Sequence, residues 1–64
     1  MKQKELKNLA KKIAKFELII QNSDDMAERA KAEAAIMELS GKVNSLEDIV
    51  IIDELVQEYI EELS

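Results

Sequence analysis

Residues 6–20 read LKNLAKKIAKFELII, and residues 49–63 read IVIIDELVQEYIEEL. In both stretches large apolar residues recur at steps of 3, 4, 3 and 4 positions. This spacing places their side chains in one seam along a helix, at the a and d positions of a heptad repeat. Because each seam needs another helical surface to cover it, the pattern predicts an all-α fold. The first seam consists of Leu6, Leu9, Ile13, Phe16 and Ile20, and the second of Ile49, Ile52, Val56, Tyr59 and Leu63.

The size of the chain favours a single helical domain over residues 1–64 that associates with itself. Domains this small rarely draw more than about 3–5 kcal/mol from one core, and they usually add disulfides, a metal or oligomerisation. The chain has no cysteine and no histidine, so the disulfide route and the commonest metal ligand are missing. We therefore expect a homo-oligomer, most simply a homodimer, held together through the two seams.

Three helices are expected, over about residues 2–21, 24–40 and 46–63. The sequence contains no proline and one glycine, which is typical of long helices joined by short turns. The β-branched cluster at 49–52 resembles a strand, but the second seam continues beyond it at the helical period. Two heptads are too few for a freestanding coiled coil, so a small three-helix bundle, or a helical hairpin with an extra helix, is the better interpretation.

Polar residues and the glycine predict where the second helix begins and ends. Asn22 or Ser23 is expected to cap its first turn, with Asp24 and Asp25 inside that turn, where negative charge is favourable. Gly41 is suited to a left-handed turn at its C-terminal end.

The second helix carries apolar residues on two sides. One stripe is formed by Ala32, Ile36, Leu39 and Val43, and the other by Met26, Ala30, Ala34 and Met37. Because a helix with two apolar sides must be covered twice, we interpret the second group, the Met–Ala stripe, as a candidate docking face for a partner. The alternative is that its alanines serve only as strong helix formers.

Charge is distributed unevenly along the chain, whose net charge is −5. Residues 1–21 contain six lysines and two glutamates, whereas residues 46–64 contain seven acidic residues and no basic one. This polarity predicts attraction between the first and third helices. A lysine row also resembles a nucleic-acid or membrane surface, but the single arginine and the position of both aromatic residues, Phe16 and Tyr59, in the seams argue against these two partners.

An acidic face is expected on the third helix, formed by Glu47, Glu54, Glu58 and Glu61. Its simplest role is contact with solvent. No metal or other cofactor is predicted, because the calcium loop of an EF-hand and its glycine are absent. A different possibility is that this face imitates nucleic acid and occupies a basic partner surface, as an acidic inhibitor does.

Catalysis is not expected, because the chain lacks histidine, cysteine and a glycine-rich phosphate loop. Lysines interrupt the apolar residues of the first twenty positions, so no signal segment is predicted and a cytoplasmic location is expected.

Glu17, beside Ile13 and Ile20, is interpreted as an edge residue of the first seam, with a buried selector of register as the alternative. The sequence thus predicts a non-enzymatic adaptor or regulatory subunit that binds itself and another protein and has no small-molecule substrate.

Overall fold

The computed structural model describes residues 2–63, and these form three helices. They are α1 (Gln3–Asn22), α2 (Met26–Ser40) and α3 (Leu46–Leu63). Each lies within two residues of its expected bounds, and no strand occurs in the described part of the chain. The predicted all-α, three-helix fold is therefore confirmed.

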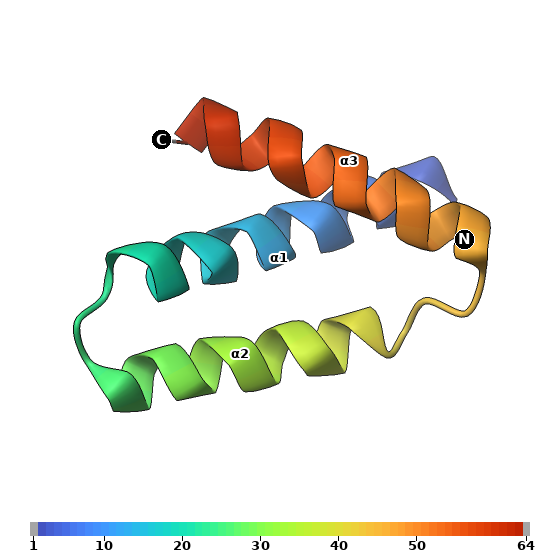
Figure 1. Ribbon diagram of the computed structural model, residues 1–64. Helices are drawn as coiled ribbons and strands as arrows, with labels where there is room; N and C mark the ends of the chain where they lie inside the picture. Colours follow the sequence, from blue (N-terminus) through green and yellow to red (C-terminus); the bar gives the residue numbers. More distant parts are fainter. Residues whose placement is uncertain (1, 64) are drawn as a thin grey trace.

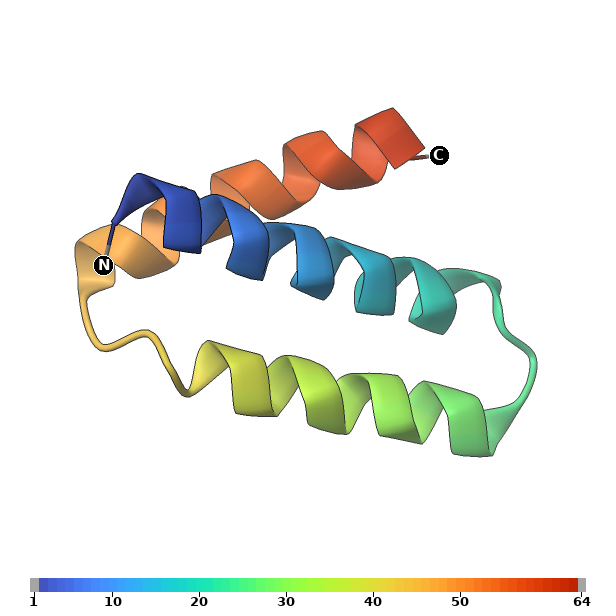
Figure 2. The same cartoon turned by 180° about the vertical axis from the view of Figure 1, so that it is seen from behind.

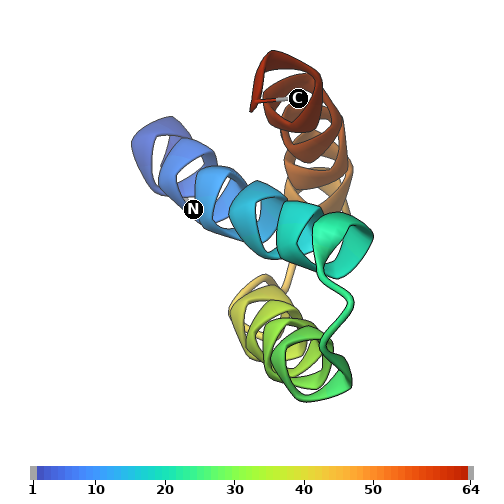
Figure 3. The same cartoon turned by 90° about the vertical axis from the view of Figure 1, so that its left-hand side faces the viewer.

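The three helices form an open layer with α1 in the middle (Figure 1). Helix α2 runs antiparallel to α1 on one side, and α3 runs parallel to α1 on the other (Figure 1 and Figure 2). No Cα atom of α2 comes within 8 Å of a Cα atom of α3. The view along the layer shows the same order, with α1 between its two neighbours (Figure 3). The Cα trace measures 34 × 24 × 15 Å, so the molecule is flat, and both outer helices have a side that no helix covers.

The core is centred on α1, because α1 is the only helix that packs against both others. Its buried side meets the middle of α3, and half-buried side chains of α2 close the other flank. Buried alanines on α1 let the neighbouring helices approach closely. Buried residues are Leu6, Leu9, Ala10, Ile13 and Ala14 from α1, Ala32 from α2, and Ile52 and Val56 from α3.

The turn between α1 and α2 is organised by two side chains. The carboxylate of Asp25 accepts a hydrogen bond from the backbone N–H of Ala27 at 2.9 Å, which makes Asp25 the N-cap of α2. The Ser23 hydroxyl oxygen accepts from the N–H of Asp25 at 3.2 Å. The predictions that Asn22 or Ser23 caps the helix and that Asp24 and Asp25 lie inside it are therefore wrong. Ser23 shapes the turn itself, and the helix starts after Asp25.

The end of α2 also differs from expectation at Gly41. This residue has φ −65° and ψ −15°, the ordinary right-handed helical conformation, so the predicted left-handed turn is wrong. Its N–H still bonds to the carbonyl of Met37 at 3.0 Å. The next two N–H groups, of Lys42 and Val43, bond three residues back at 3.2 and 3.1 Å. The helix thus ends by tightening into successive short turns, which satisfies its last carbonyls without a left-handed residue.

Candidate interaction surfaces

The two seams meet mainly inside the chain. Helix α3 diverges from α1 toward its C-terminal end (Figure 1 and Figure 3), and the C-terminal ends of both seams are covered less well than Leu6, Leu9 and Ile13. The seam residues Leu6, Leu9, Ile13, Ile52 and Val56 are buried, Phe16, Ile20 and Tyr59 are half-buried, and Ile49 and Leu63 are exposed. The buried seam residues therefore belong to the chain's own core.

The Met–Ala stripe lies on the uncovered side of α2. Met26 is 82% exposed and Met37 is 76% exposed, and both alanines of the stripe are exposed as well. The other apolar stripe of α2 faces α1, with Ala32 buried and its larger members packed against the core. The sequence-based separation of α2 into an inner and an outer apolar side thus agrees with the structure.

A shallow hollow opens within the exposed side of α2. Its lining residues are Met26, Arg29, Ala30 and Glu33, all from one helix. Their spacing of i, i+3, i+4 and i+7 puts an apolar pair next to an oppositely charged pair. The apolar pair belongs to the Met–Ala stripe, and the charged pair lies on its flank, as the helical spacing of the sequence predicts.

A second apolar surface, the α3 patch, lies at the start of α3 and consists of Leu46, Ile49 and Val50. Leu46 is 81% exposed, Val50 is 56% exposed and Ile49 is 41% exposed. Of these three residues, only Ile49 belongs to a predicted seam. Leu46 and Val50 are four positions apart, and this spacing is the signal that could have revealed the patch. Ile49 also lines a small hollow with Ser40, Val43, Ile52 and Asp53, where the start of α3 passes the end of α2.

The four glutamates of the acidic face are all exposed. Helical spacing places them on the side of α3 opposite Ile52 and Val56, which face the core. The lysine row of α1 is exposed as well, at Lys4, Lys7, Lys11 and Lys15. The two charged surfaces thus belong to different helices.

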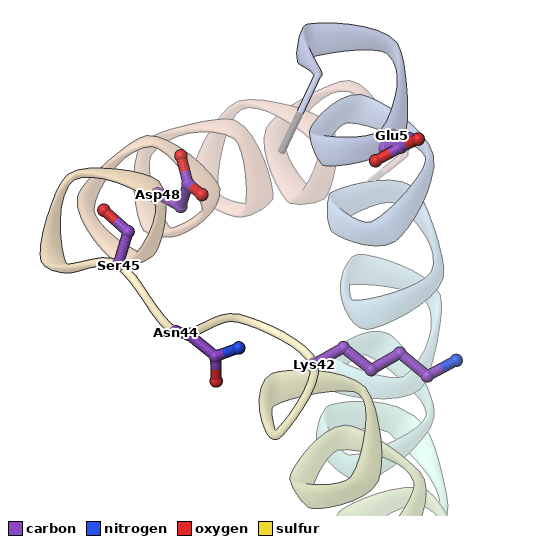
Figure 4. A pocket seen from close by; sticks show the side chains of 5 residues that line it. All are labelled: Glu5, Lys42, Asn44, Ser45 and Asp48. Carbon is purple, nitrogen blue, oxygen red and sulfur yellow. The ribbon is translucent and has the colours of Figure 1, made fainter.

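A polar hollow lies where the α2–α3 loop passes the beginning of α1 (Figure 4). Asp48 and Ser45 line it from the α3 side, Glu5 from α1, and Asn44 and Lys42 from the loop, with Lys42 directed away from Asp48 (Figure 4). Its residues are mixed in charge. Within residues 2–63, no group of three or more carboxylate, histidine or cysteine side chains is placed to hold a metal ion.

Glu17 is half-buried, and no charged residue of the described chain is fully buried. This position agrees with the edge interpretation and not with a buried selector of register.

Protein-family models, curated proteins and solved structures were compared with the chain, and none of them matches it. Among the described residues, no helix has the length and apolar character needed to cross a bilayer.

Proposed function

We propose that this protein is a non-enzymatic helical interaction module that works as a homodimer and offers its remaining surface to another protein. The observation that carries the proposal is the exposure of large apolar side chains on the open sides of α2 and α3. Contiguous apolar surface of this kind marks interaction sites in water-soluble proteins.

The size of the core supports association. Five buried side chains are larger than alanine, and full burial of such a side chain contributes roughly 1.5–3 kcal/mol. The accessible surface is 4862 Å², whereas a compact monomer of 7.3 kDa exposes about 4,200 Å². The difference between these two areas is of the same order as the roughly 800 Å² that each partner buries in a standard interface. A dimer would therefore restore the burial that the open layer lacks.

Light scattering coupled to size exclusion, over a hundredfold range of protein concentration, tests the dimer. The expected result is a mass of twice the 7.3 kDa chain at high concentration, falling on dilution. Helicity measured by circular dichroism on the same samples shows whether the monomer stays folded. A mass of 7.3 kDa at every concentration, with full helicity, would contradict the proposal.

The second protein is tested by affinity capture from source lysate at low and at raised salt. An adaptor that docks through apolar surface should hold its partner at both salt concentrations, because burial of apolar area depends weakly on ionic strength. A capture that yields only the protein itself at both salt concentrations would contradict the adaptor role.

A second candidate function is supported by the exposed acidic face. Its four carboxylates are all on one side of α3, and residues 46–64 contain seven acidic residues and no basic one. Such a surface suits an acidic inhibitor that occupies a basic groove. Its partner should be lost steeply as salt rises, and Glu54→Gln with Glu58→Gln should weaken capture at low salt, whereas the adaptor's partner should withstand both changes.

A further inference from the structure

We propose that the homodimer forms through α2, with the Met–Ala stripe of one copy packed antiparallel against the same stripe of a second copy. This inference rests on the proposed self-association and specifies its surface. Three features of α2 carry it: the order of residue sizes along the stripe, the hollow within it, and the charges beside it.

The order of residue sizes is nearly symmetric about the middle of α2. Along the stripe, a large residue at 26 and a large residue at 37 flank the small Ala30 and Ala34. In an antiparallel pair with its two-fold axis between the two alanines, Met26 faces Met37 of the second copy. Ala30 then faces Ala34 of the second copy, and the small side chains let the two helices approach closely at the axis. An isologous interface needs this kind of self-complementary patch.

The hollow on α2 has the geometry that receives a side chain from a facing helix. Met26, Arg29, Ala30 and Glu33 surround it at i, i+3, i+4 and i+7. Four residues at this spacing form the hole of knobs-into-holes packing. In the antiparallel pair, this hole faces the stretch of the second copy from Ala34 to Met37. Methionine is flexible and suits the filling of an irregular hollow.

The charges beside the stripe complement themselves across the same axis. Arg29 and Glu33 are exposed and lie on one flank of the stripe. In the antiparallel pair, Arg29 comes beside Glu33 of the second copy, and symmetry repeats this pair once. The flanks of antiparallel helices meet in this way, and opposite charges there favour the pairing.

The α3 patch is a poorer surface for a second copy, although its apolar side chains are larger. It is flanked by Glu47, Asp53 and Glu54, and α3 contains no basic residue. Two copies that met through this patch would bring like charges together, which disfavours the contact. The charges therefore favour α2 as the surface for the second copy. The α3 patch then remains available to the other protein that the proposed function includes.

Charge reversal tests the assignment with exposed residues, so the fold of the chain is preserved. Arg29→Glu or Glu33→Arg alone places like charges beside each other at both symmetric positions. Each should raise the dimer dissociation constant, measured by sedimentation equilibrium at low salt, by about tenfold. The double variant Arg29→Glu/Glu33→Arg restores opposite charges and should return the dissociation constant to that of the original protein. Lys15→Glu makes the same change in net charge as Arg29→Glu, but at an exposed position of α1, and it should leave the constant within about twofold.

Cysteine pairing tests the geometry directly, because the chain has no cysteine of its own. A mixture of Ala30→Cys and Ala34→Cys variants should give a disulfide-linked dimer of the two on mild oxidation, since a disulfide requires Cα atoms within about 7 Å. Val50→Cys, in the α3 patch, should stay unlinked. The assignment to α2 is wrong if the charge reversals leave the dissociation constant unchanged and the mixture of Ala30→Cys and Ala34→Cys forms no disulfide-linked dimer. It is also wrong if Val50→Cys forms a disulfide-linked dimer. In both cases the proposed self-association would still stand. A chain that is monomeric at every concentration would overturn both.

Discussion

The ammonium nitrogen of Lys11 lies 5.7 Å from the centroid of the Tyr59 ring. This contact joins α1 to α3 beside the buried middle of the two seams. Tyr59 is half-buried and packs against the core, so its ring presents one side to apolar neighbours and remains open to the cation. A cation within about 6 Å of a ring centroid is attracted by the negative charge on the ring face.

Lys11→Met removes the charge and keeps a long apolar side chain, so it isolates the interaction between the cation and the ring. The free energy of unfolding should fall by about 0.5–1 kcal/mol, measured by urea denaturation at one fixed protein concentration. Lys15→Met, also an exposed lysine of α1, is the matched control and should change stability by less than about 0.5 kcal/mol. Equal effects of the two substitutions would show that the ring contributes nothing.

The cap of α2 leads to a second prediction. Asp25→Ala removes the acceptor for the Ala27 N–H and should lower the free energy of unfolding by about 1 kcal/mol, within a range of roughly 0.5–2. Asp25→Asn keeps an acceptor and should retain most of that stability. Asp24→Ala, one position earlier, is the control and should have a smaller effect. If Asp24→Ala is the more damaging change, the cap assignment is wrong.

Gly41 should tolerate a side chain, contrary to what its place after a helix suggests. Its φ is negative, and a Cβ atom would meet the carbonyl oxygens of Glu38 and Met37 at 3.4 and 3.5 Å, which is ordinary contact. Gly41→Ala should therefore raise the free energy of unfolding by about 0.4–1 kcal/mol, because the unfolded chain loses more freedom. Thermal and urea denaturation both measure this change. A decrease of 1 kcal/mol or more would mean that the residue needs a left-handed conformation.

The helices and the inner side of each could be predicted from the sequence because they follow from periodicity. The spacing of Leu6, Leu9 and Ile13 repeats along α1. The assignment of a helix and of its inner side therefore rests on several turns and does not depend on any single residue. The two incorrect predictions, at Asp25 and Gly41, concern single residues at helix ends. There, one side-chain hydrogen bond or one dihedral angle decides the geometry, and neighbouring residues such as Ser23 and Asp25 can each serve as a cap.

The open arrangement of the layer could not be predicted, because it depends on which helices meet. The seams show that α1 and α3 each need a partner, but two seams can pair within one chain or between chains with the same residues. The structure pairs them within the chain, around Ile13, Ile52 and Val56. The Met–Ala stripe could be predicted from the sequence because α2 has two apolar sides. Since one of them packs against α1, the other is exposed.

Ile13 provides the strongest test of the core around α1. Its side chain is 6% exposed and belongs to the same buried cluster as Ile52 and Val56. Ile13→Asp would place a carboxylate among these side chains without a partner, a cost of several kcal/mol that exceeds what a core of this size provides. We expect loss of helical circular dichroism at 25 °C, whereas Ile13→Val should cost only about 0.5–1.5 kcal/mol and keep the fold. Asn8→Asp introduces the same charge at an exposed position of α1 and should retain full helicity. Unchanged helicity and mass in Ile13→Asp would mean that α1 is not the centre of the core, and the open layer would have to be abandoned together with the α2 dimer built on it.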